Sequence, residues 1–343
     1  MTQNLQFGLD TFGDVAYDEQ HQRLSYEASL RNIVEEAKLA DRLGIDVLAL
    51  GEHHRQEYSI SSPETVLAAI ATVTEKIILG TGVTVLSSDD PVRVYERFAT
   101  LHALSNGRAQ IMLGRGSFTE SFPLFGYDLA DYEDLFEEKF ALFNELLKGE
   151  PVNWQGRLTQ TLNNTQVYPK IEGSLAAHLG VGGSPASIVR AAEYGLPLML
   201  AIIGGEPTRF LPYIDLYKRA ALKFGQPIHP IGMHSHGVIA DTDEAAQEIA
   251  WNYLKKSMDQ IGRERGWQPM DRARFEFEIT EGSYYVGSPE TVAQKIARVI
   301  QTLGVQRFDF VYGAGGQLQQ DRFRTIQLYG EKVIPRVKEL LRG

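Results

Sequence analysis

The sequence contains no cysteine among its 343 residues, which excludes disulfides, thiolate nucleophiles and cysteine-ligated metal sites. It also has no apolar run of about 18 residues, so we expect no transmembrane helix and no membrane partner. The polar residues 1–4 lead directly into a predicted strand instead of forming a secretory signal. Because a signal is missing, we expect a cytoplasmic protein.

Positive charge is also scarce. The formal net charge is −10 and the sequence pI is about 5.4. Nucleic-acid phosphates require a basic face, so we expect no nucleic-acid partner. With 43% hydrophobic residues, a chain of this length can bury a large core. We therefore predict one large domain over residues 1–343.

Strand-like and helix-like segments alternate along the chain. Strands are predicted at 5–12, 47–50, 77–86, 109–115, 177–183, 197–203, 231–240 and 307–312, and helices at 23–43, 63–73, 91–104, 132–147, 185–194, 208–224, 243–262, 289–303 and 317–341. Alternation of this kind indicates a parallel α/β sheet, and eight strands close a (β/α)8 TIM barrel. An open dinucleotide-binding sheet is disfavoured, because no G-x-G-x-x-G follows the first strand.

Two segments interrupt the alternation and are predicted to be insertions, one after the fourth helix and one after the helix that follows strand seven. Residues 150–173 are polar and rich in turn residues, which indicates an excursion with a small hairpin. Residues 267–283 lack a clear period, and we predict an irregular segment there.

The second predicted strand ends in three titratable residues, Glu52, His53 and His54. Active sites of parallel α/β proteins lie at the carboxyl ends of strands, and imidazole exchanges protons near neutral pH. We predict that His53 and Glu52 belong to a catalytic site, with Glu52 orienting one of the histidines. The alternative is that the histidines only satisfy hydrogen bonds at the strand end.

The fifth predicted strand ends in a sequence typical of anion binding, which comprises Gly182, Gly183, Ser184, Pro185 and Ser187. Glycines allow backbone N–H groups to point at a ligand, and the start of a helix favours negative charge. We predict a phosphate site there, although simple helix capping by Ser184 would give the same pattern.

Other strand ends add candidates. Arg115 stands between two glycines, where its guanidinium could bind an anion or form a structural salt bridge with Glu120 or Asp128. His234 and His236 alternate along strand seven and so share one face. Two histidines could be metal ligands if Glu52 or His53 converged with them. Without cysteine or an H-E-x-x-H spacing we predict no metal, and we predict instead a second site that handles a proton or contacts substrate, with His236 as a catalytic candidate.

Taken in order, these motifs resemble those of the bacterial luciferase-like, flavin-dependent monooxygenase family. The segments that carry the resemblance are GEHH (51–54), LGTGVTVLSSDDPVRVYE (79–96), LGRGSF (113–118), FGYDL (125–129), GVGGSPAS (180–187) and GSPETVAQKIARVIQTLGV (287–305). The resemblance spans almost the whole chain. It implies a barrel that binds reduced FMN at its carboxyl face.

The resemblance also implies residue roles. The FMN phosphate would lie at Gly183, Ser184 and Ser187, near Arg115. The flavin ring would lie on the segment Thr81, Gly82 and Val83, in which the family often has a non-prolyl cis peptide, which here would be the Gly82–Val83 bond. His53 matches the active-site histidine of the luciferase branch, and His236 matches a histidine of the alkanesulfonate branch. Residues 267–283 would form a lid.

Two departures from the family pattern matter. Glu133 stands where the luciferase branch has a second arginine near the phosphate, and the exit of strand eight (311–315) lacks the tyrosine of the alkanesulfonate branch. Light emission and sulfonate cleavage are therefore not supported. The resemblance also suggests a homodimer through the helices that follow strands two and three.

From these features we expect an enzyme that uses FMNH2 and O2 to oxygenate a small organic substrate, supplied with flavin by a separate NAD(P)H:flavin reductase. An F420-dependent hydride-transfer enzyme on the same fold is the nearest alternative, and a non-catalytic flavin-binding protein is a second. A phosphosugar aldolase or isomerase is disfavoured, because no predicted strand contains a lysine for Schiff-base chemistry.

Overall fold

The computed structural model describes residues 5–116, 118–264 and 266–342. Its main sheet has ten strands, and along the path β3-β2-β1-β12-β10-β9-β8-β5-β4 each strand is parallel to its neighbours. The strands are β1 (Gln6–Thr11), β2 (Val47–Leu50), β3 (Ile78–Thr81), β4 (Thr84–Val85), β5 (Gln110–Gly114), β8 (Ala176–Val181), β9 (Leu198–Ala201), β10 (Gly232–Ile239), β11 (Tyr285–Gly287) and β12 (Arg307–Val311). Because β3 and β4 are two parts of one interrupted strand, the ends of the path meet and the sheet closes. The predicted (β/α)8 TIM barrel is confirmed.

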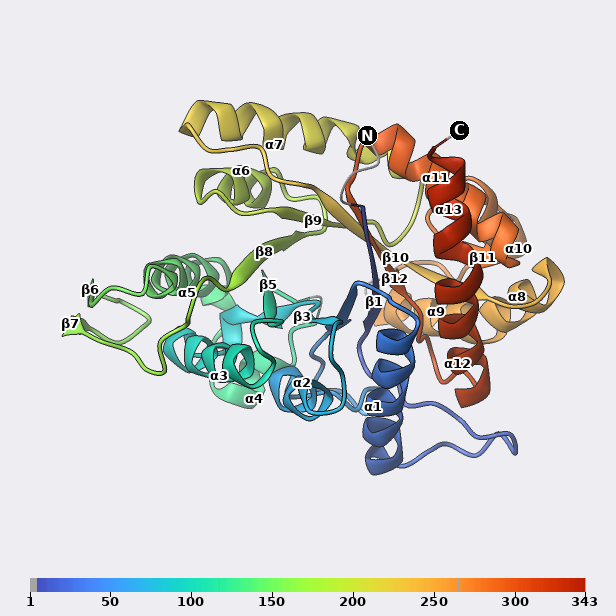
Figure 1. Cartoon of the computed structure of the whole chain (residues 1–343), viewed down its shortest axis with the longest axis horizontal. Helices are drawn as coiled ribbons and strands as arrows, with labels where there is room; N and C mark the ends of the chain where they lie inside the picture. Colours follow the sequence, from blue (N-terminus) through green and yellow to red (C-terminus); the bar gives the residue numbers. More distant parts are fainter. Residues whose placement is uncertain (1–4, 117, 265, 343) are drawn as a thin grey trace.

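The helices surround this barrel (Figure 1). They are α1 (Tyr26–Arg42), α2 (Pro63–Ala71), α3 (Pro91–Leu104), α4 (Ser121–Phe125), α5 (Tyr132–Leu147), α6 (Pro185–Glu193), α7 (Leu211–Phe224), α8 (Asp243–Ile249), α9 (Lys255–Glu264), α10 (Arg272–Thr280), α11 (Pro289–Leu303), α12 (Gln319–Leu328) and α13 (Ile334–Leu340), with 3-10 turns η1 (Leu86–Ser88), η2 (Leu129–Asp131) and η3 (Pro207–Phe210) and π turns η4 (Ala250–Leu254) and η5 (Tyr329–Val333). Each longer helix has an apolar stripe, as in α11, where Val292, Ile296 and Val299 are buried at helical spacing. The π turns join α8 to α9 and α12 to α13, within the single helices predicted over 243–262 and 317–341.

The strand predicted at 77–86 is interrupted at Gly82 and Val83, whose peptide bond is cis. The side chain of Val83 lies against two neighbouring strands at points where both have glycine. A Cβ atom at Gly114 would lie 2.6 Å from Cγ2 of Val83, and one at Gly180 would lie 2.7 Å from its Cγ1. These distances are too short for real contacts, so both glycines are needed to make room for Val83.

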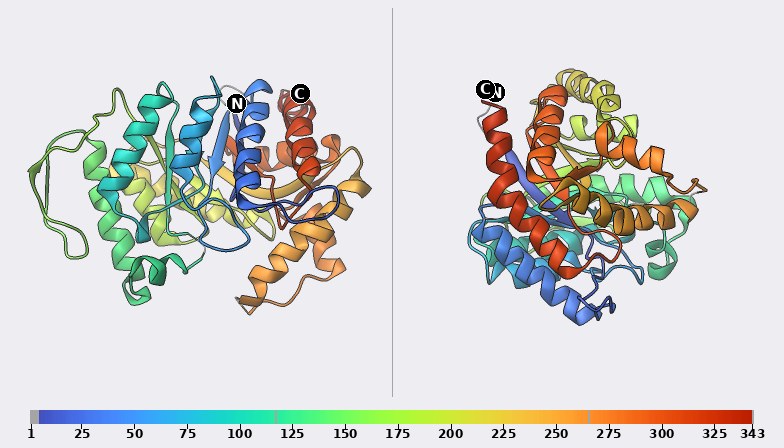
Figure 2. Two further views of the ribbon diagram at one scale, coloured as in Figure 1. Left: turned by 90° about the horizontal axis from the view of Figure 1, so that it is seen from below. Right: turned by 90° about the vertical axis from the view of Figure 1, so that its right-hand side faces the viewer.

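The excursion at 150–173 contains a two-stranded antiparallel sheet, formed by β6 (Val152–Trp154) and β7 (Leu162–Thr165). It projects beyond α5, away from the barrel (Figures 1 and 2). None of its residues lines the cavity described below.

The prediction that 267–283 is irregular is wrong, because α10 occupies most of this segment. The helix begins after Asp271, whose side chain accepts a hydrogen bond from the backbone N–H of Arg274 at 2.8 Å. The helix α10 packs with α8, η4 and β11 around a second apolar cluster that includes Leu254, Phe275 and Tyr284. Residues that follow β10 therefore build a wall with its own core beside the barrel mouth.

Candidate active site

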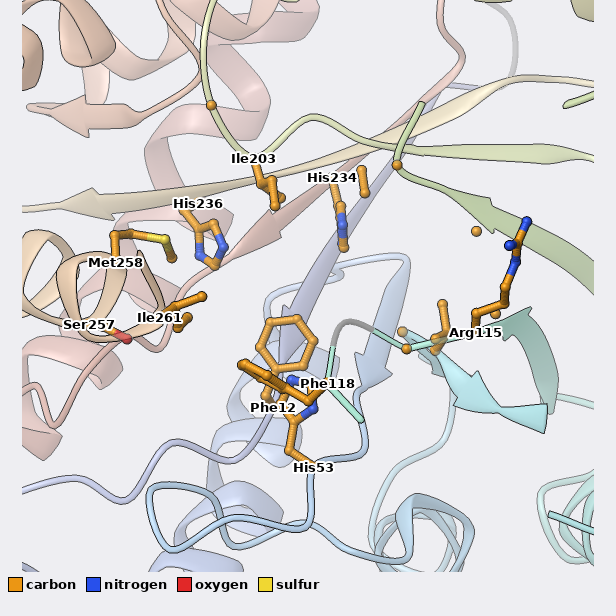
Figure 3. Close-up of a pocket in the computed structure, with 18 of the residues that line it drawn as sticks. Phe12, His53, Arg115, Phe118, Ile203, His234, His236, Ser257, Met258 and Ile261 are labelled. Carbon is orange, nitrogen blue, oxygen red and sulfur yellow. The ribbon is translucent and has the colours of Figure 1, made fainter. Parts of the chain in front are cut away.

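A cavity of about 1080 Å³ lies at the carboxyl ends of the barrel strands. It is lined from many elements, and its walls include both His53, which follows β2, and Ser184, which precedes α6. Figure 3 shows Arg115 at one end of this space and His236, Met258 and Ile261 at the other. The two predicted sites, for an anion and for proton transfer, therefore open into one cavity.

At the floor of the cavity, His53 is enclosed by aromatic rings. Its ring centroid lies 4.8 Å from that of Phe12, 4.6 Å from that of Tyr58 and 4.6 Å from that of Phe118. Phe12 and Phe118 lie beside His53 in Figure 3. Gly51 is required there, because any Cβ atom at this position would overlap the ring of Phe12. The imidazole of His53 is thus held in place by ring contacts on several sides.

Glu52 also lines the cavity, and it pairs with the second histidine of the motif. Its Oε1 lies 2.8 Å from Nε2 of His54, and its Oε2 accepts a weak hydrogen bond from the backbone N–H of Val85 at 3.4 Å. The ring of His54 lies edge-on to Phe125, with 5.0 Å between centroids. Of the two histidines, it is therefore His54 that Glu52 orients.

His234 and His236 both point into the cavity from β10 (Figure 3). Nδ1 of His234 is hydrogen bonded to Oδ2 of Asp10 at 2.7 Å, and Asp10 is completely buried on β1. Burial raises the pKa of Asp10, and the hydrogen bond to His234 opposes this shift. The sequence analysis did not identify Asp10, which lies 224 residues from its partner.

Unlike His234, His236 is hydrogen bonded to no carboxylate in the part of the chain that the structure describes. Its Nδ1 is buried and has no hydrogen-bond partner among the described residues. Burial lowers the pKa of His236 to about 3, and the neighbouring His234 contributes to the shift. The imidazole of His236 is therefore neutral at physiological pH, so it can exchange hydrogen bonds with a ligand without introducing charge.

The predicted anion site is built around the first turn of α6. Nη2 of Arg115 donates a hydrogen bond to Oγ of Ser187 at 2.6 Å, and the side chain of Ser184 caps the helix by accepting from the N–H of Ser187 at 3.4 Å. Gly183 has a φ of +119°, which favours glycine. Guanidinium, hydroxyl and helix N–H groups are the donors expected of a phosphate site.

Arg115 has a carboxylate partner that the sequence did not predict. It forms an ion pair with Glu133, at the start of α5, and not with Glu120 or Asp128. Glu120 lies instead 3.7 Å from Nε of Arg55, and Asp128 caps η2 through the N–H of Ala130. The suggested structural salt bridge therefore exists, but with a different residue.

The predicted flavin-ring segment is only partly exposed to the cavity. Gly82 and Val83 line it, as do Gly182 and Ser187. Thr81 is buried below the surface, where its hydroxyl accepts a hydrogen bond from the N–H of Met112 at 3.1 Å. The role of Thr81 in this structure is to tie β3 to β5.

Two kinds of feature are not found in the described part of the chain. Among residues 5–116, 118–264 and 266–342, no three His, Asp or Glu side chains are grouped so that they could hold a metal ion. None of the helices described there combines the length and the apolar character needed to cross a membrane.

The sequence matches a family model described as luciferase-like monooxygenase over residues 11–307. The chain belongs to this family. The resemblance proposed from the motifs is thereby confirmed, and the chain is an enzyme of the luciferase-like monooxygenase family.

Curated relatives match over most of the chain. The alkanal monooxygenase alpha chain of Photorhabdus laumondii is 24% identical over 374 residues, which cover 97% of this chain and 99% of the relative. The limonene 1,2-monooxygenase of Rhodococcus erythropolis is 27% identical over 276 residues, or 77% of this chain and 70% of the relative.

Solved structures of low identity share the luciferase-like fold. A monooxygenase from Streptomyces bottropensis superimposes with a TM-score of 0.81 at 21% identity, covering 96% of this chain and 99% of the other. The oxygenating constituent of 3,6-diketocamphane monooxygenase from Pseudomonas putida, solved in complex with FMN, gives 0.77 at 19% identity, covering 97% and 99%. The F420-dependent tetrahydromethanopterin reductase of Methanopyrus kandleri gives 0.70 at 20% identity, covering 97% and 99%.

Several residues of the site were not identified from the sequence of this luciferase-like chain. Phe12 and Asp14 line the cavity just after β1, and Tyr132 and Phe136 line it from α5. The rule that selects carboxyl ends of strands would have found the first pair. The second pair lies on a helix, so only the folded arrangement brings it to the site.

Proposed function

We propose that this enzyme uses reduced FMN and O2 to oxygenate a small, mainly apolar organic substrate. The observation that carries the proposal is the single cavity that joins the anion site at Arg115 to the histidines. Its volume of about 1080 Å³ slightly exceeds the range of roughly 300–1,000 Å³ usual for ligand pockets, which leaves space for a flavin and a second molecule.

The residues present fit the phosphate and the ring of FMN. Arg115, Ser187 and the N-terminal turn of α6 supply donors for the phosphate. Gly82 and Val83 supply an apolar, side-chain-poor surface on which a flat ring could rest. Bound reduced FMN would supply the electrons that activate O2.

The chain itself would provide position, proton transfer and exclusion of water. His53 is fixed by aromatic contacts beside the cavity, where its imidazole could hold or move a proton near the flavin. Glu52 fixes His54, and neutral His236 would donate or accept a hydrogen bond from the substrate. We assign these roles on position and chemistry together.

The lining of the cavity wall opposite Arg115 favours a mainly apolar substrate. Ile203, Met258 and Ile261 line it, with His236 and Ser257 as polar groups beside them, and Trp267 also lines the cavity. A compact molecule with one carbonyl or hydroxyl group would match this lining. Trp267 belongs to the segment 267–283, and we propose that this segment acts as the lid of the cavity.

Binding and turnover test the proposal directly. We expect the purified protein to bind FMN and to consume FMNH2 faster when pooled aldehydes or ketones are added. His53→Ala should lower substrate-dependent oxygenation by about 10²-fold or more, because general acid–base groups contribute on this scale. FMN binding by this variant would show that the cavity is intact, and an unchanged rate would remove the role given to His53.

F420 is the second candidate cofactor, because a solved structure with the same fold is F420-dependent. Parallel titrations of the protein with FMN and with F420 decide between them. Binding of F420 without binding of FMN would overturn the choice of FMN. A bound FMNH2 that oxidises at the same slow rate with every substrate tested would instead favour a non-catalytic flavin-binding protein.

We further propose that a separate NAD(P)H:flavin reductase supplies FMNH2 and that the enzyme is a homodimer formed through α2 and α3. In α2, Ala69 is exposed and could allow a close approach of another helix, whereas Ala71 is buried within the subunit. Sedimentation of the purified protein tests the dimer, and a monomer at micromolar concentration would contradict it.

A further inference from the structure

Two glutamates from one helix neutralise the positive charge around the anion site. Glu133 pairs with Arg115, and Glu137, one turn further along α5, pairs with Arg190, whose Nε donates to Oε2 at 2.9 Å. Both guanidinium groups lie over the ring of Phe136, at 5.5 Å and 5.4 Å from its centroid. The formal charges of these four side chains therefore cancel beside the site.

Arg115 does not need Glu133 to hold its position. Its guanidinium is hydrogen bonded to Ser187 and lies over the rings of Tyr132 and Phe136. Its side chain is only 17% exposed, whereas that of Glu133 is 63% exposed. An ion pair with so exposed a partner adds little to stability. The main effect of Glu133 is to reduce the positive charge that Arg115 presents to an arriving anion.

We propose that Glu133 competes with the flavin phosphate for Arg115 and thereby keeps FMN in ready exchange with solvent. This inference rests on the proposed FMN site. A phosphate bound to Arg115 carries up to two negative charges, and a carboxylate about 5 Å away would repel it enough to weaken binding about tenfold, or about threefold when salt and solvent screen the charge.

The test compares two ligands that differ only in the phosphate. FMN and riboflavin are titrated by fluorescence into the wild-type protein and into Glu133→Gln, which keeps the size of the side chain and removes its charge. We expect Glu133→Gln to bind FMN about three- to tenfold more tightly, with riboflavin affinity unchanged. The gain should shrink as the salt concentration rises.

Glu137→Gln is the matched control, because it removes the same charge one helical turn away. Arg190 does not line the cavity, so this variant should change FMN affinity less than Glu133→Gln does. Equal gains in the two variants would show an effect of overall charge and would overturn the proposal. So would an unchanged FMN affinity in Glu133→Gln, or equal gains for FMN and riboflavin.

Arg115→Ala separates failure of this inference from failure of the proposed function. We expect it to weaken FMN about tenfold or more and to leave riboflavin binding unchanged. If Arg115→Ala weakens FMN in this way but Glu133→Gln has no effect, the phosphate site stands and only the role of Glu133 is refuted. If Arg115→Ala leaves FMN affinity unchanged, the phosphate lies elsewhere, and both the phosphate site at Arg115 and the role of Glu133 are refuted, whereas loss of the proposed function itself would appear as absence of FMN binding to the wild type.

Discussion

Gly180→Ala should destabilise the protein because its new methyl group would collide with Val83. The Cβ atom would lie 2.7 Å from Cγ1 of Val83 and 3.3 Å from Sδ of Met112. Relief requires Val83 to move by about 1 Å. The backbone of Val83 is held by the pairing of β4 with β5, which begins at the next residue with Thr84 opposite Leu113. Overpacking of this kind costs about 1–3 kcal/mol, so we expect a loss of about 2 kcal/mol in the free energy of unfolding.

Urea unfolding of a double-mutant cycle measures this collision. Val83→Ala alone removes two methyl groups from a partly exposed side chain and should cost less than about 1.5 kcal/mol. In the double variant the two alanines fit together, so at least half of the loss caused by Gly180→Ala should be recovered. Gly182→Ala is the control, because a Cβ there meets no atom within 4 Å.

The collision between Gly180→Ala and Val83 should also affect FMN affinity. If Val83 is pushed into the cavity, FMN should bind less tightly to Gly180→Ala, and Val83→Ala should restore the affinity. A Gly180→Ala variant as stable as the wild type would refute this account of the glycines. A loss of stability that Val83→Ala does not rescue would also refute it.

Two further predictions concern parts of the chain outside the cavity floor. Burial and the charge of Arg307 lower the pKa of His178 to about 3, so the stability that its neutral form provides is complete above about pH 6.5 and is lost as the pH falls towards 3. In urea titrations, the unfolding free energy of His178→Gln should therefore drop by about 2 kcal/mol less than that of the wild type between pH 7 and pH 5. An identical drop in the two proteins would contradict this. Asp271→Ala removes the N-cap of α10 and should lower stability by about 1 kcal/mol and speed proteolysis between 266 and 283, which mass spectrometry of limited digests would locate. Asp271→Asn, which can still cap the helix, should behave like the wild type.

Much of the fold could be predicted because its signals are local. Short apolar runs such as VLAL at 47–50 are buried on both faces in a parallel barrel, so they are recognisable without any partner strand. The break at Gly82 and Val83 is not visible in this way, since TGVTV reads as a continuous strand. The segment that forms α10 alternates aromatic and charged residues in RFEFE, which obscures the helical period.

In the site, too, residues with a local sequence signal could be predicted, whereas their distant partners could not. His53, Arg115 and Ser184 were found because each follows a strand at its carboxyl end, and the structure brings all three to one cavity. The partners of cavity residues such as His234 and Arg115 could not be found, because pairing depends on the closed barrel. Asp10 reaches His234 across the interior, and Glu133 reaches Arg115 from a helix. Charge and spacing in the sequence carry no information on such distant contacts.

The apolar cluster behind the far wall of the cavity has a consequence for how this enzyme could change its chemistry. Leu254, Phe275 and Tyr284 belong to an apolar cluster that is separate from the main core and reaches the barrel through Val238 of β10, so α8–α10 have a core of their own. Substitutions or exchanges between β10 and β11 could change the far wall of the cavity and leave the residues around Arg115 unaltered. A change of substrate specificity would then require changes only between β10 and β11, with the rest of the barrel unchanged.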